Sequence, residues 1–152
     1  MINRRRCCLV LTGALALAGC GSSSSSPLTQ AQLVSQVNRA CTSYSAAVRG
    51  LLPPSDITTN TDAAAAYLDK LKGPVHAESD KITALTPNGA VKEEFGRFVR
   101  ATKYQLGLFT DADAKAHAHN GGFVVDLDHA ARYKRRVLDR LERQLGFTSC
   151  LS

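Results

Sequence analysis

The stretch that decides the fold runs from Gly89 to Phe109 and reads GAVKEEFGRFVRATKYQLGLF. Its apolar side chains recur every three or four residues, so they share one side of a helix in which successive residues are 100° apart. The residues on that side are Val91, Phe95, Phe98, Val99, Thr102, Leu106 and Phe109. A stripe of this kind predicts an amphipathic helix that buries one face against other helices.

Three more segments have the same period. The first begins at Thr29, where Thr29 and Gln32 have capping-box spacing, and it ends before Pro53-Pro54. Another runs from about Asp62 to just before Pro87, and the last runs from Phe123 to Gly146. No segment alternates in the way a half-buried strand would.

These patterns predict an all-α protein, an antiparallel four-helix bundle over residues 28–152. Gly73-Pro74 lies inside the second predicted helix. Because proline lacks a backbone donor and clashes with the preceding turn, we expect a kink or a break there.

The N-terminal residues 1–19 read as a cleaved signal peptide. Three arginines, Arg4 to Arg6, precede an apolar run from Cys7 to Ala18 that is too short to span a bilayer as a helix. Removing this segment and its three arginines leaves 133 of the 152 residues and lowers the net charge from +6 to +3. An exported chain with so small an excess of positive charge is not expected to bind nucleic acid.

Leu17-Ala18-Gly19-Cys20 resembles the lipobox of bacterial lipoproteins. The resemblance implies a diacylglyceryl group on the Cys20 thiol, cleavage before Cys20, and in some envelopes an additional N-acyl chain. It places the protein on the extracytoplasmic face of the cell membrane, or on the outer membrane in a Gram-negative envelope, because Gly21 follows the cysteine. The alternative is ordinary secretion with a free Cys20. Residues 20–27 then form a flexible serine-rich spacer.

Several short runs in the body resemble small exported helical proteins of actinobacteria. The runs are Val37-Asn38-Arg39-Ala40-Cys41, Leu52-Pro53-Pro54, Tyr67-Leu68, Ala84-Leu85-Thr86-Pro87 and Leu145-Gly146-Phe147. This resemblance implies a helical fold and an exported compartment, and it implies no activity.

Two of the five cysteines, Cys41 and Cys150, lie in the body of the mature chain. An isolated pair in an exported protein predicts a disulfide, here one that closes nearly the whole domain. The alternative is a redox-active pair, but the chain has no Cys-x-x-Cys motif to support it.

One polar cluster has the side chains of a metal site. Asp113 and His117 are four residues apart and share a helix face, while His129 lies beyond the Asn120-Gly121-Gly122 turn. Imidazole and carboxylate groups could together hold zinc, copper or nickel. The competing interpretation is a solvated helix end, and His119 is on the opposite side of the helix from His117.

The last predicted helix carries a basic stripe made of Arg132, Arg136, Arg140 and Arg143. Such a stripe could contact anionic lipid headgroups, envelope polymers or an acidic protein, or it could simply be a solvated face. We expect Asp139 within the arc of the stripe and Glu142 beside it, where both weaken the local field. Lys134 falls within the apolar arc, so its amine must extend to solvent, pair with an acid or mark a cleft.

The sequence contains no nucleophile elbow, no His-Glu-x-x-His and no phosphate-binding glycine loop. We therefore expect no enzymatic activity and no cofactor other than the lipid on Cys20. The leading hypothesis is a membrane-tethered lipoprotein whose helical domain binds or scaffolds envelope partners. The alternative is an accessory lipoprotein that binds a metal or a small ligand. A deep pocket would favour the alternative, whereas a filled core with a flat basic flank would favour scaffolding.

Overall fold

The computed structural model describes residues 26–151, so the predicted signal peptide, Cys20 and most of the predicted spacer lie outside the described residues. Four helical rods make up the domain. They are α1 (Gln30–Val48), α2 (Thr61–Thr83), α3 (Lys92–His117) and a composite rod of α4 (Phe123–Tyr133), a π-helical turn (Lys134–Leu138) and α5 (Asp139–Leu145). Short 3-10 turns occupy Gly89–Val91 and Thr148–Cys150.

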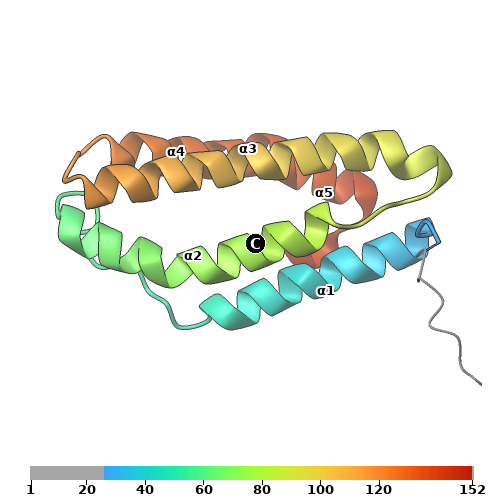
Figure 1. The fold of residues 1–152 in the computed structure, drawn as a ribbon, viewed down its shortest axis with the longest axis horizontal. Coiled ribbons are helices and arrows are strands. Elements are labelled where there is room, and N and C mark those ends of the chain that lie inside the picture. The colour runs from blue at the N-terminus through green and yellow to red at the C-terminus, as the bar shows by residue number, and fades with distance from the viewer. Residues whose placement is uncertain (1–25, 152) are drawn as a thin grey trace, which may run out of the picture.

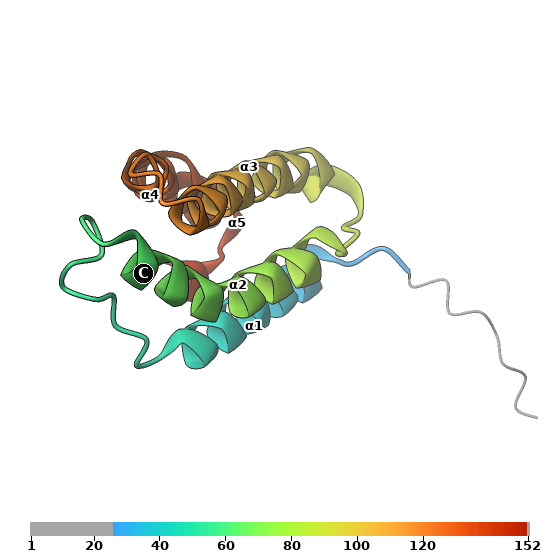
Figure 2. The same cartoon turned by 60° about the vertical axis from the view of Figure 1, so that its left-hand side comes forward.

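The rods alternate in direction, as Figure 1 shows. Helix α1 contacts α2, α2 contacts α3, and α3 contacts both α4 and α5. Turning the molecule shows α1 and α2 as one layer and α3 with the last rod as the other (Figure 2). The prediction of an all-α four-helix bundle is confirmed.

Local chemistry sets the helix ends. Thr29 and Gln32 form the expected capping box, in which each side chain bonds to the other residue's backbone N–H at 3.3 and 2.9 Å. Asn60 caps α2 by accepting from the Ala63 N–H at 3.1 Å. Gly146 ends α5 with φ of 80°, a left-handed conformation that glycine adopts without steric cost.

Of the two outcomes expected at Gly73-Pro74, a kink or a break, the break does not occur, because helix α2 passes through these residues without interruption. Pro74 lies close to the middle of the helix, and the α2 axis changes direction in its central part in both views. The missing hydrogen bond is tolerated because the helix is anchored on both sides of the proline by buried Leu68 and Ile82.

The last rod is helical from Phe123 to Leu145, as predicted, but a π turn interrupts its regular period at Lys134–Leu138. A π turn has more residues per turn than an α-helix. Residues after Leu138 are therefore rotated relative to the positions that an unbroken 100° step assigns to them. This rotation changes which side chains of α5 face the interior.

The buried apolar residues form two clusters. The larger lies between α1, α3, α5 and the C-terminal turn, and it includes Phe95, Phe98 and Phe147 in mutual aromatic contact. The smaller joins α2, α3 and α4 at the other end of the bundle around Leu68 and Phe123. Within residues 26–151, no helix combines the length and the apolar character that a bilayer span requires.

Candidate functional site

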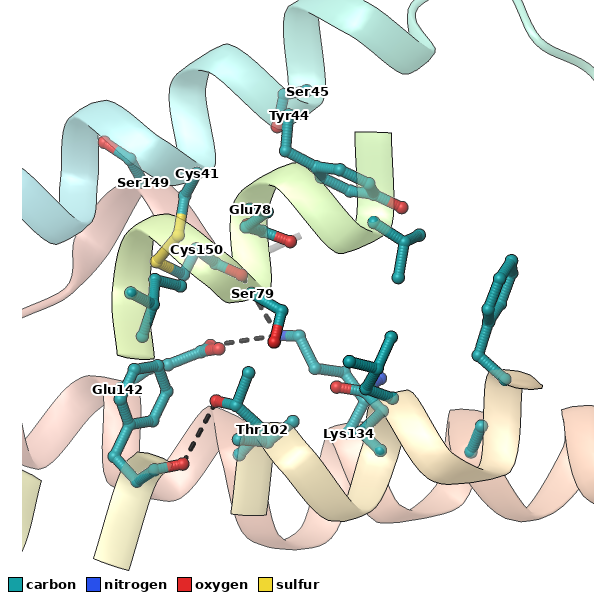
Figure 3. Close-up of a pocket in the computed structure, with 18 of the residues that line it drawn as sticks. Cys41, Tyr44, Ser45, Glu78, Ser79, Thr102, Lys134, Glu142, Ser149 and Cys150 are labelled. Carbon is teal, nitrogen blue, oxygen red and sulfur yellow. Dashed lines mark hydrogen bonds and ion pairs between the residues drawn. A yellow bond between two sulfur atoms is a disulfide. The ribbon is translucent and has the colours of Figure 1, made fainter. Parts of the chain in front are cut away.

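A cavity of about 300 Å³ lies within the bundle where the two clusters meet. All four rods contribute to its walls, as Figure 3 shows. The apolar lining includes Leu71, Val75, Phe98, Leu106 and Phe109, and the polar lining includes Tyr44, Glu78, Ser79, Thr102, Lys134 and Glu142. Ser45 and Ser149 also line the cavity and are exposed, so it reaches the surface beside α1.

Lys134, in the π turn, is fixed inside this cavity by three acceptors. Its Nζ donates to a carboxylate oxygen of Asp139, to Glu142 Oε2 at 2.9 Å and to the Cys150 carbonyl oxygen at 3.0 Å. Burial alone would lower the pKa of Lys134, but the bonds to Asp139 and Glu142 raise it above its ordinary value. Of the three possibilities for Lys134, the structure therefore shows acid pairing beside a cleft rather than extension to solvent.

Glu142 is buried, and the expectation that it lies beside the arginine stripe is wrong. Asp139, expected within the stripe, is instead ion-paired with Lys134. The Glu142 side chain is 4% exposed and ion-paired with Lys134. The physical reason is the π turn, which rotates α5 so that Glu142 faces the bundle interior. Burial raises the pKa of Glu142, while its hydrogen bond and charge interaction with Lys134 oppose that shift.

Glu78, on α2, is the acidic group of the cavity lining that is not paired with Lys134. Figure 3 shows its carboxyl group within the cavity, and it makes no hydrogen bond or ion pair with any residue of the described range 26–151. Burial, with a smaller contribution from the Glu142 charge, raises the pKa of Glu78 to about 7, although the positive charge of Lys134 opposes this shift. Burial and the charge of Glu78 also raise the pKa of the nearby Tyr44 hydroxyl.

The raised pKa has a consequence for stability. Unfolded Glu78 ionises near its ordinary pKa of 4.5, whereas in the folded protein it keeps its proton until about pH 7. The folded state thus binds the proton more strongly, so the contribution of Glu78 to stability is present at low pH and is lost as the pH rises through 7. The protein holds an ionisable group whose placement costs stability at neutral pH.

Glu78 is not among the site residues predicted from the sequence, although the sequence carries a signal for it. The apolar stripe of α2 skips from Val75 to Ile82, and the two positions that would continue it are Glu78 and Ser79. A polar pair in a gap of the apolar stripe indicates either a satisfied core network or a cavity. Only the packing of the other helices shows that Glu78 faces a cavity.

The predicted metal residues are brought together in part. His117 Nε2 lies 3.6 Å from Asp113 Oδ1 and 3.1 Å from Oδ1 of Asp69, an α2 residue that the sequence analysis did not select. His129 does not join them: it lies against Tyr104, with 6.0 Å between the ring centroids. His119 is also apart, since it lies beyond the helix end and contacts Asp62 at 3.3 Å.

All four arginines of the predicted stripe are exposed. Arg132 is paired with Asp128 at 2.6 Å, whereas Arg136, Arg140 and Arg143 make no ion pair within the described part of the chain. Arg140 also borders an open groove between α3 and the last rod, together with Arg97 and Arg100. The stripe is thus a surface feature outside the cavity lining.

The predicted disulfide between Cys41 and Cys150 is present, with 5.1 Å between the two Cα atoms. It joins α1 to the C-terminal turn, and both cysteines line the cavity beside Lys134.

Comparison with protein-family models, curated proteins and solved structures finds no match to this chain. The functional conclusion therefore depends on the site itself.

Proposed function

We propose that this chain is a membrane-tethered lipoprotein whose helical domain binds a small organic cation in the cavity of the bundle. The observation that carries the proposal is the carboxyl group of Glu78, which faces a largely apolar cavity with no partner among residues 26–151. Pockets that combine apolar walls with a few convergent polar groups and shifted pKa values are typical ligand sites.

The charges around the cavity favour a cation over an anion. An ammonium group has three protons to donate, and all three donors of Lys134 have acceptors in Asp139, Glu142 and the Cys150 carbonyl. An anionic ligand would have to displace one of these bonds. Glu78 makes no ion pair among residues 26–151, and the nearby charge of Lys134 only partly offsets the cost of burying its ionised form.

The size and walls of the cavity limit the ligand further. A volume of about 300 Å³ is at the lower end of the range for small-molecule sites. Phe98, Phe109 and Leu106 would contact an apolar or aromatic body, while Glu78 receives the cationic head. The ligand class is therefore a compact amine with an apolar substituent.

Benzylamine and its neutral counterpart benzyl alcohol test this proposal as probes. At pH 8, the full chain in mild detergent is expected to bind benzylamine at least about tenfold more tightly than benzyl alcohol. The reason is that a hydrogen bond to a charged group contributes about 1.5–3 kcal/mol. At pH 5 the preference should disappear, since Glu78 with a pKa of about 7 is then protonated. Ligand-observed NMR titration measures both affinities.

Glu78→Gln should abolish the preference for benzylamine at pH 8 while leaving the affinity for benzyl alcohol nearly unchanged. The matched control is Asp80→Asn, which removes an exposed carboxylate two residues away on the same helix and should keep the preference. Equal affinities of the native chain for the two probes at pH 8, or no binding of either, would contradict the proposal.

The tether is the other part of the proposed function, and its support is the lipobox ending at Cys20. Two or three acyl chains hold a protein at a bilayer far more firmly than one. Anchoring concentrates the binding domain in a thin layer at the membrane and so raises its effective concentration for ligands and partners found there. The exposed arginine stripe would favour contacts with anionic headgroups or envelope polymers in that layer.

Cys20→Ser tests the tether. The variant is expected to move from the membrane fraction to the soluble fraction of the cell envelope, because serine has no thiol to accept the diacylglyceryl group. Fractionation followed by immunoblotting measures the distribution, and Ser24→Ala in the spacer is the matched control, which should stay with the membrane. A Cys20→Ser chain that sediments with membranes as completely as the native chain would refute the anchor.

A further inference from the structure

A second polar site lies between α2 and α3, nearer to the C-terminal end of α3 than the cavity. Asp69 of α2 meets Asp113 and His117 of α3, and one ligand atom from each lies within 4.8 Å of the other two. His117 Nε2 is 3.1 Å from Asp69 Oδ1 and 3.6 Å from Asp113 Oδ1. The two α3 residues are four apart, so they project from the same helix face.

These separations fit a tetrahedral metal ion. Zinc binds imidazole nitrogen and carboxylate oxygen at about 2.0–2.2 Å, and two ligands at tetrahedral positions are then about 3.3–3.6 Å apart. The 3.1 Å contact between His117 and Asp69 is a hydrogen bond, and both it and the 3.6 Å separation of His117 from Asp113 lie near that interval. The site thus needs little rearrangement to bind.

A second observation points to a ligand independently of the cluster. The Asp113 side chain is only 6% exposed. Its Oδ1 is completely buried and has no hydrogen-bond partner among the described residues. His117 at 3.6 Å is too distant for a hydrogen bond. A buried carboxylate oxygen without a partner is costly in the free protein, and a cation at this position would satisfy it.

We propose that Asp69, Asp113 and His117 form a zinc-class metal site with a fourth position open to solvent. The other oxygen of Asp113 is held by Lys72 at 2.8 Å, which orients the carboxylate and leaves Oδ1 for the metal. His117 and Asp69 are half exposed, so an ion can enter from the surface. This site shares no residue with the lining of the cavity, and the inference does not depend on the proposed amine ligand.

The donor set discriminates among ions. Calcium takes six to eight oxygen ligands, and magnesium keeps most of its waters around one or two carboxylates. Three protein ligands, one of them an imidazole, instead suit zinc and its neighbours among the divalent transition metals. Lys72 offsets one of the two carboxylate charges, so a divalent ion would leave the group with a single positive charge that a bound hydroxide can balance.

Titration of the tag-free full chain in mild detergent with zinc alone tests the inference. We expect one ion per chain with a dissociation constant in the micromolar range or lower, measured against a chromophoric chelator. Cobalt in place of zinc should give the visible absorption of a tetrahedral complex. Calcium at the same concentration should not bind.

Variants then assign the site. His117→Gln and Asp69→Asn alter half-exposed side chains, so both should fold, and each should weaken zinc binding by more than about tenfold. Asp113→Asn preserves the shape of the buried residue and should do the same. The matched control is His119→Gln, since this histidine lies two residues away and outside the cluster. Absence of zinc binding at micromolar concentration, or unchanged affinity in His117→Gln, would overturn the inference.

Discussion

Removing the Cys41–Cys150 disulfide is expected to lower the free energy of unfolding by about 2–5 kcal/mol, the range typical of native disulfides in small exported domains. The bridge joins residues 109 positions apart. In the chain-entropy model a loop of about 100 residues gives about 4.7 kcal/mol, because the crosslink restricts the unfolded chain. The expected loss is therefore near the upper end of that range.

The native state gives a further reason for a large effect. The disulfide holds the C-terminal turn against α1, and the carbonyl oxygen of Cys150 is one of the three acceptors of Lys134. A C-terminal turn that detaches from α1 would remove this acceptor from the charged network of the cavity. Loss of the crosslink should thus remove contacts in the cavity wall of the folded protein, in addition to releasing the restriction on the unfolded chain.

Urea unfolding of Cys41→Ala, Cys150→Ala and the double variant separates the crosslink from the local packing of sulfur. Either single substitution already breaks the bridge, so the double variant should lose only about 1 kcal/mol more than either single one. Chemical reduction of the native chain should reproduce most of the effect. A double variant that loses the sum of the two single effects, or a single variant as stable as the native chain, would contradict this account.

The fold could be predicted from the sequence because each rod carries an apolar stripe of helical period and most of the rods have clear end signals. The Thr29 and Gln32 pair and Gly146 act at helix ends as expected. The sequence left a kink and a break at Pro74 both open, and the break does not occur because proline has only a local cost, whereas the buried residues on both sides fix the helix. Tertiary packing keeps α2 continuous at Pro74, and the local sequence gives no information about that packing.

The sites were predictable only within single helices. The spacing of Asp113 and His117 placed them together, but Asp69 comes from another helix and its approach depends on how α2 packs on α3. Glu142 was misplaced because a constant 100° step fails beyond the π turn. Lys134 was recognised as unusual from its place in the apolar arc, and its partners became evident only in the folded protein.

Lys134→Met is expected to destabilise the protein by about 3–5 kcal/mol near pH 8, the cost typical of removing one partner from a buried ion pair. Methionine has a similar length and can fill the same space, so little of the loss should come from packing. The loss arises because Glu142, with a side chain 4% exposed, keeps its charge without a positive partner. Asp139 also loses a partner, but its side chain is 17% exposed and water can compensate in part.

The pH dependence of this loss identifies its cause. Lys134 opposes the upward shift that burial imposes on the pKa of Glu142, so the variant raises that pKa further. The charged form of Glu142 is then the destabilising one, and the loss of stability in Lys134→Met should be large at pH 8 and shrink as the pH falls toward 5, where the carboxyl group takes up a proton.

Lys134→Met/Glu142→Gln should be more stable than Lys134→Met at pH 8, since no uncompensated buried charge remains at position 142. Urea unfolding at the two pH values measures all three chains. A deficit that is the same at pH 5 and pH 8, or a double variant less stable than Lys134→Met, would show that Lys134 acts through packing rather than charge.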